Sequence, residues 1–111
     1  MDDNINNSLA QNKVLMLYAL DNAKRDITES DLFKLISPVN NINYFYFKQL
    51  LADLVDSNLV QTYVKEEDVT TQQVLYRLTS EGKNSLDLTI DVLPGIIKLK
   101  MDNILKNEFN N

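Results

Sequence analysis

Residues 74–86, VLYRLTSEGKNSL, decide the fold of this chain. The residues up to Leu78 are rich in β-branched, aromatic and aliphatic types, which is typical of a β-strand. Thr79 follows at once, and its hydroxyl can accept a hydrogen bond from the first turn of a helix. Glu81 then lies in that first turn, where the helix dipole favours a negative charge. The stretch therefore predicts a strand that passes directly into a helix.

A helix followed by a second strand is predicted immediately upstream. Asn43 is a suitable N-cap, and Asn58 suits the left-handed position that ends a helix. Between them, apolar residues recur at the spacing of one helical face, namely Phe47, Leu50, Leu51, Leu54 and Val55. Residues 59–65 are again β-rich, so 59–65 and 74–78 form a predicted hairpin around the polar tip EEDVTTQQ.

Three more helices complete the predicted order. A buried helix is expected at 11–22, around the apolar run VLMLYAL, and a second helix is capped by Thr28 and ends before Pro38. A fourth runs from the Thr79 cap to about Ile90, and a last one starts near Gly95. Residues 26–28 can add a short third strand. The order predicts an α+β, mainly α fold, a winged helix-turn-helix with a two- to three-stranded wing and an extra C-terminal helix. We divide it into a disordered tail (1–8), the winged-helix domain (9–93) and the C-terminal helix (94–111).

Composition removes several classes of function. The 111 residues include no Cys and no His, so disulfides, thiolate or imidazole metal sites and the commonest general base are all excluded. The carboxylates form no recognisable catalytic constellation. We therefore expect no enzymatic activity, no cofactor and no metal. The amino terminus lacks the basic start of a signal peptide, and no apolar run is long enough for a membrane span, so a cytoplasmic location is expected.

Charge complicates a role in DNA binding. The net charge is −5, whereas duplex-binding domains usually carry an excess of Lys and Arg. At about 100° per residue, the face of the third helix opposite its apolar stripe contains Phe45, Gln49, Ala52, Asp53 and Asp56, with Tyr46 and Lys48 on its margins. Gln49 can read adenine, Lys48 can contact guanine or phosphate, and the hydroxyls of Tyr44 and Tyr46 can reach the backbone.

The remaining basic residues allow two interpretations. In the wing, Lys65 is followed by three acidic residues, while Arg77 and Lys83 lie near its base. Lys24 and Arg25 precede the second helix. These residues either contact phosphates or belong to a solvated surface of mixed charge. The environment of the aromatic residues 44–46 also has two alternatives. If their side chains face outward, they suit a protein partner; if they face inward, they pack against the second helix.

These residues resemble a known family. The segment LLADLVDSNLV leading into the wing, together with YRLTSEGKNSL after it, is similar to PadR-like and MarR-like winged-helix regulators. More narrowly, the chain from about Leu9 to Lys106 resembles an uncharacterised bacterial family of winged-helix domains of unknown function. The resemblance implies double-stranded DNA as a partner and a homodimer. It implies a DNA-binding role for the helix that holds Asn43, Tyr44, Tyr46, Lys48 and Gln49, and a dimerising role for the last helix, through Ile97, Met101, Ile104 and Leu105. Lys65 and Arg77 are added as candidate DNA contacts of the wing.

Two functions follow as expectations. The first is a dimeric DNA-binding transcriptional regulator. The alternative is a winged helix used as a protein-interaction module without strong DNA binding, with Phe45, Tyr46 and the last helix as the contact surface. The acidic wing departs from the usual pattern of such regulators and argues against wing-mediated DNA contact. The apolar face of the last helix must be buried, either against the domain itself or against a second copy of the chain. A small-molecule effector bound between the dimer helices stays open, and the sequence does not identify one.

Overall fold

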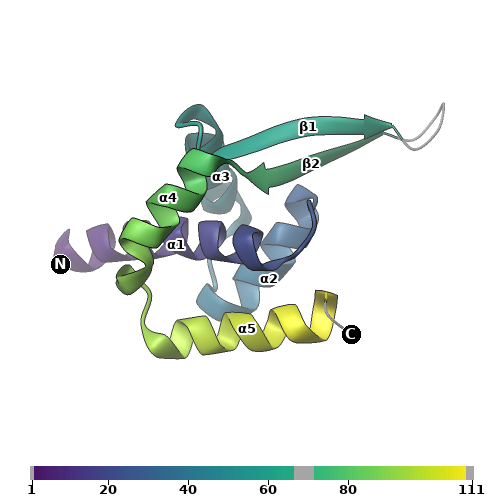
Figure 1. Ribbon diagram of the computed structural model, residues 1–111. Helices are drawn as coiled ribbons and strands as arrows, with labels where there is room; N and C mark the ends of the chain where they lie inside the picture. Colours follow the sequence, from purple (N-terminus) through teal and green to yellow (C-terminus); the bar gives the residue numbers. More distant parts are fainter. Residues whose placement is uncertain (1, 67–71, 110–111) are drawn as a thin grey trace.

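The computed structural model describes residues 2–66 and 72–109, with side chains placed for 9–66 and 72–108. Figure 1 gives the arrangement of the elements. In chain order they are α1 (Asp2–Asn22), α2 (Glu29–Asn40), α3 (Tyr44–Asp56), β1 (Val60–Glu66), β2 (Gln72–Leu78), α4 (Ser80–Thr89), the short 3₁₀ helix η1 (Ile90–Val92) and α5 (Gly95–Phe109). The predicted order of elements is confirmed.

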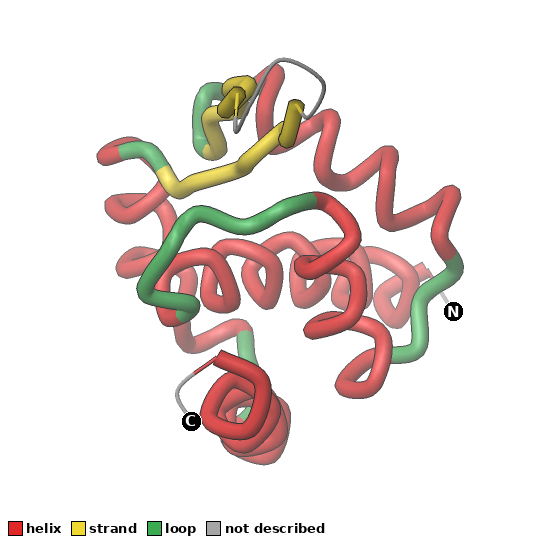
Figure 2. Tube along the Cα trace, turned by 90° about the vertical axis from the view of Figure 1, so that its right-hand side faces the viewer, coloured by secondary structure: helices red, strands yellow, loops and turns green. Residues whose placement is uncertain are grey.

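Helix α1 forms the centre of the fold. It runs between the wing on one side and α5 on the other, as the two views in Figures 1 and 2 agree. The predicted apolar run is buried, apart from Tyr18, which is half-buried. The helix begins at Asp2, nine residues before the predicted start at Gln11, so the backbone of 2–8 continues the helix instead of forming a separate tail. The Asn-rich composition there has low helix propensity, and the sequence therefore gave no reason to extend the helix.

Helix α2 begins as predicted and ends later. The hydroxyl of Thr28 accepts a hydrogen bond from the backbone N–H of Asp31 at 3.1 Å. Pro38 was expected to follow the helix but lies inside it, in its last turn. A proline there removes only one backbone hydrogen bond, while Val39 is held in the core and fixes the turn. Asn41 then ends the helix with a positive φ of 27°.

The wing is an antiparallel hairpin whose pairing runs from Val60↔Leu78 to Glu66↔Gln72. Each strand is close to its predicted bounds, although β2 starts two residues earlier than Val74. Of the predicted tip, Glu66 is the last residue of β1 and pairs with Gln72, whereas residues 67–71, with Glu67 and Asp68, lie outside the described residues. The expected third strand is reduced to a bridge in which Ile27 and Tyr76 exchange two backbone hydrogen bonds, of 3.2 and 2.8 Å.

A compact junction joins the end of α3 to the start of α4. Asn58 has the predicted left-handed conformation, with φ of 62°. The hydroxyl of Thr79 accepts from the N–H of Gly82 at 2.9 Å and donates to the carbonyl of Asn58 at 2.7 Å. The N–H of Thr79 also donates to the carbonyl of Leu59 at 3.1 Å. A Cβ at Gly82 would lie only 2.0 Å from that carbonyl oxygen, so only glycine fits. The junction thus accounts for Thr79 and Gly82 in the sequence TSEG.

Helix α5 folds back on the domain and packs against α1 and α2. The hydroxyl of Tyr18 donates to Asp102 across the contact with α1, at 2.6 Å, and burial together with this bond raises the pKa of Tyr18 to about 12. This packing corrects the prediction of the dimer surface. The side chains proposed for it are turned inward, with Met101 and Leu105 fully buried and the other two half-buried: Ile97, Met101, Ile104 and Leu105. The sequence identified the apolar face but could not tell which body covers it.

Candidate nucleic-acid interface

Helix α3 is fixed from one side and presents the other to solvent. Its N-terminus is capped by Asn43, whose side chain accepts from the N–H of Tyr46 at 2.8 Å. The predicted stripe is packed into the core, where Phe47 is fully buried. The exposed side, which we call the reading face, consists of Phe45, Lys48, Gln49, Ala52, Asp53 and Asp56. The predicted outward face is therefore confirmed, with Lys48 belonging to it and Tyr46 turned toward the core.

The first turn of α3 is held against α2 by aromatic contacts. The rings of Tyr44 and Phe33 pack edge-on, with 5.3 Å between their centres, and the centres of the Phe33 and Phe47 rings are 5.1 Å apart. The Tyr44 hydroxyl donates to the carboxylate of Glu29, and this bond is the main cause of its raised pKa. The ammonium of Lys48 lies 5.6 Å from the centre of the Tyr44 ring. Tyr44 therefore orients the helix and Lys48, and its hydroxyl already has an acceptor within the protein.

The three consecutive aromatic residues have different environments. Tyr46 packs against the core cluster and Tyr44 packs on α2, so the interpretation that they tuck inward is correct for these two. It is wrong for Phe45, which is 83% exposed. Phe45 is therefore the large apolar side chain that the reading face presents to solvent.

The two predicted wing cations are not on the same side as the reading face. Thr62 and Tyr76 are paired in the sheet and line a groove next to α3. Side chains alternate along a strand, so Lys65 and Arg77 project from the opposite face of the sheet. Arg77 is held there by a hydrogen bond from its Nε to Gln61 at 3.2 Å. Of the seven residues predicted to contact DNA, only Lys48 and Gln49 lie together with their side chains exposed on the reading face.

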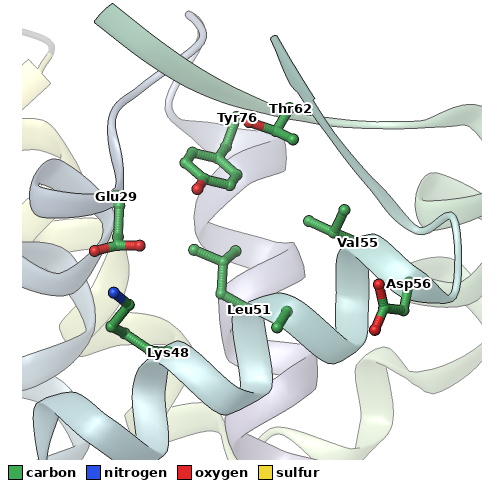
Figure 3. Close-up of a pocket in the computed structure, with 8 residues that line it drawn as sticks. Glu29, Lys48, Leu51, Val55, Asp56, Thr62 and Tyr76 are labelled. Atoms are coloured by element: carbon green, nitrogen blue, oxygen red, sulfur yellow. The ribbon is translucent and has the colours of Figure 1, made fainter.

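A groove of about 370 Å³ lies between α3, the wing and the start of α2. Figure 3 shows Leu51 and Tyr76 in its middle, Glu29 with Lys48 at one end, and Asp56 at the other. No pattern in the sequence indicates this groove directly. Its wing contribution could have been found from strand alternation and register, but the approach of Glu29 depends on how α2 packs and is not visible in the sequence.

One of the two exposed aspartates of α3 forms an ion pair with a lysine, and the other forms none within the described residues. Asp53 on the reading face pairs with Lys13 of α1 at 3.7 Å, and both side chains are partly exposed. Asp56 makes no hydrogen bond or ion pair with the part of the chain that the structure describes. The negative charge therefore lies in the C-terminal half of the reading face, whereas Lys48 and Gln49 lie in its N-terminal half.

Two further observations concern the described segments as a whole. Within residues 2–66 and 72–109, no group of three or more acidic side chains is arranged to hold a metal ion. In the same segments, none of the helices combines the length and the apolarity that crossing a bilayer requires.

Comparisons with known proteins agree with this architecture. A search of curated proteins gives no match. Among solved structures, a PadR family transcription regulator from hypervirulent Clostridium difficile R20291 is similar, with a TM-score of 0.61 and 18% sequence identity over 90% of this chain and 98% of that one. At this identity the likeness concerns the fold, which is that of a winged helix. Residues 12–111 match the family described as "Domain of unknown function (DUF4364)". The chain therefore belongs to the DUF4364 family and has the winged-helix fold.

Proposed function

We propose that this protein is a DNA-binding transcriptional regulator that acts in the cytoplasm and inserts only the first turns of α3 into the major groove. The proposal is carried by the position of Lys48 and Gln49, which lie next to each other on the exposed N-terminal half of a helix whose opposite side is buried. This is the placement that a helix-turn-helix needs for its reading helix. The similarity of the fold to a PadR family regulator supports the same assignment.

The chemistry of these two side chains fits base readout. Gln49 can form two hydrogen bonds with adenine, and Lys48 can donate to guanine or to a phosphate. The positive end of the helix dipole favours approach of a phosphate to the same turns. Insertion beyond Ala52 would bring Asp53 and Asp56 toward the DNA backbone, so the docking must be shallow.

The test is a titration of labelled duplexes at low and at moderate salt. Gln49→Ala should reduce discrimination at one base pair by about 1–3 kcal/mol. Lys48→Gln should weaken binding to all sequences and lower the salt slope by about 1 if it contacts a phosphate. Lys100→Gln is the matched control, because Lys100 is exposed on α5 away from the reading face. Absence of binding to any duplex in dilute buffer would refute the proposal.

We also propose that the regulator is a dimer, with the corner from α4 to α5 as the contact. Large apolar side chains are exposed along this segment: Leu88, Val92, Ile96 and Leu99. Ile96→Asp should convert a dimer to a monomer in sedimentation velocity. Val64→Asp on the wing is a matched control, because Val64 is 55% exposed and Ile96 is 58% exposed. A wild-type protein that sediments as a monomer at every concentration would contradict this proposal.

A protein-interaction module is the second candidate, and Phe45 is the observation in its favour. Phe45 lies in the first turn of α3 beside Lys48 and Gln49 and is 83% exposed, and an exposed aromatic ring suits a protein interface better than a polyanion. Phe45→Ser should then abolish capture of a partner while the melting temperature stays unchanged. If the same variant instead loses only duplex binding, the protein-interaction function is wrong.

A further inference from the structure

A second charged surface lies at the base of the wing, away from the reading face. A cleft of about 290 Å³ is formed there by the end of α1, the connection to α2 and the start of the α4 junction. Three basic side chains from two separate segments line it, namely Lys24, Arg25 and Arg77. The cleft lies on the face of the sheet opposite the one that borders α3, because Arg77 alternates with Tyr76. We call it the basic cleft.

Two carboxylates also line the basic cleft, Asp21 and Asp26, and each accepts a hydrogen bond from another side chain. Asp21 accepts from the ammonium of Lys83 at 2.9 Å, and Asp26 accepts from the hydroxyl of Tyr63. The bond to Asp26 is the main cause of the raised pKa of Tyr63. The lining therefore contains three cations and two carboxylates, and Lys83 outside it pairs with both Asp21 and Asp87, at 2.9 and 3.4 Å. Three cations against two carboxylates leave a formal charge of +1 at the cleft on a chain whose net charge is −5, which is opposite in sign to a phosphate group.

Arg77 is held in place, and both Arg77 and Lys24 keep donors available. The guanidinium of Arg77 lies 5.2 Å from the centre of the Tyr63 ring, and its Nε is bonded to Gln61. Its terminal nitrogens make no hydrogen bond with the described residues. Lys24 has a positive φ of 64°, a conformation that costs less for Gly or Asn. Its ammonium likewise has no partner within the described ranges. The stacked guanidinium of Arg77 is thus preorganised, while the left-handed backbone at Lys24 fixes only the point from which its flexible side chain extends.

We propose that the basic cleft binds a phosphate group, with Arg77 and Lys24 as its main ligands. The planar fork of Arg77 donates two hydrogen bonds to phosphate oxygens, and Lys24 adds a mobile point charge. The phosphate belongs either to a free phosphorylated molecule or to a nucleic-acid backbone. Because the cleft and the reading face lie on different sides of the wing, the inference holds whether or not α3 reads DNA.

The experiment is a ¹H–¹⁵N NMR titration of the full chain with inorganic pyrophosphate and, separately, with a short DNA duplex, each against sodium chloride of equal ionic strength. Pyrophosphate should produce saturable shifts confined to the amides of 24–26 and to the Arg77 Nε–H. Lys24→Gln and Arg77→Gln should each weaken this binding about tenfold. Lys100→Gln should leave it unchanged, and so should Gln49→Ala, which separates this site from the reading face.

The two probes distinguish the sources of phosphate. Shifts with pyrophosphate support the site for a free phosphorylated molecule, and shifts at the same amides with the duplex alone support it for a nucleic-acid backbone. The proposal is overturned if neither probe gives saturable shifts at these positions. It is also overturned if Lys100→Gln reduces the affinity as much as Lys24→Gln, because the binding would then reflect only overall charge.

Discussion

Replacing Gly82 with alanine should destabilise the fold by about 2 kcal/mol, which follows from the junction between α3, the wing and α4. The added Cβ would lie 2.0 Å from the carbonyl oxygen of Leu59 and 2.8 Å from a methyl of Leu78, whereas real Cβ atoms essentially never approach closer than 3.0 Å. The helix must therefore move by about 1 Å, and the hydrogen bond from Thr79 to Leu59 must stretch or break.

The magnitude combines three contributions. Overpacking against a rigid neighbour costs about 1–3 kcal/mol, and the lost backbone hydrogen bond costs about 1 kcal/mol. Alanine returns about 1 kcal/mol through its higher helix propensity. Urea unfolding, monitored by circular dichroism, measures the resulting change in the free energy of unfolding. Gly95→Ala is the control, because nothing lies within 4 Å of its added Cβ, and it should be neutral or stabilising. Equal stability of the Gly82 and Gly95 variants would refute the reasoning.

Three further predictions use other contacts. Thr79→Ala removes both hydrogen bonds of the hydroxyl and should cost about 1–2 kcal/mol in urea unfolding, whereas Thr79→Ser should retain most of the stability; equal losses would contradict a capping role. Tyr18→Phe should cost up to about 1 kcal/mol near neutral pH. The folded pKa of Tyr18, about 12, lies above its usual value of 10.0, so the stability from this group is fully present below pH 10 and is lost as pH rises toward 12. If the wild-type protein loses no more stability than Tyr18→Phe between pH 10 and about 12, the Tyr18 hydroxyl does not contribute as expected. Asp53→Asn should change stability by less than about 1 kcal/mol, because its ion pair with Lys13 is exposed, and should strengthen duplex binding in the titration; weaker binding would argue against docking by the reading face.

The local signals in the sequence predicted the elements well. The caps at Thr28, Asn43 and Thr79 each make the expected hydrogen bond. Leu50 and Leu54 share the core, as their helical spacing required. These features depend on neighbours within a few residues, so periodicity and cap chemistry are sufficient to find them.

Features that depend on packing between distant segments could not be predicted. Pro38 is tolerated in α2 because Val39 is anchored in the core, and the inward face of α5 is set by α1 and α2. For the candidate site, the sequence supplied Lys48 and Gln49 but grouped Arg77 with them. The register of the wing places Arg77 on the other face, beside the turn that holds Lys24. The positions of basic residues in the sequence do not show which of them lie close together in the fold.

The junction at Thr79 also has a consequence for how the wing can change in evolution or by design. The hairpin is closed at its base, where the N–H of Thr79 meets the carbonyl of Leu59, so the spacing between α3 and α4 is independent of the number of residues beyond that point. Lengthening a loop closed in this way costs only about 0.6 kcal/mol per doubling. Relatives with longer or shorter wings should therefore superimpose in their helices, and the hairpin end is the natural place to insert a reporter peptide.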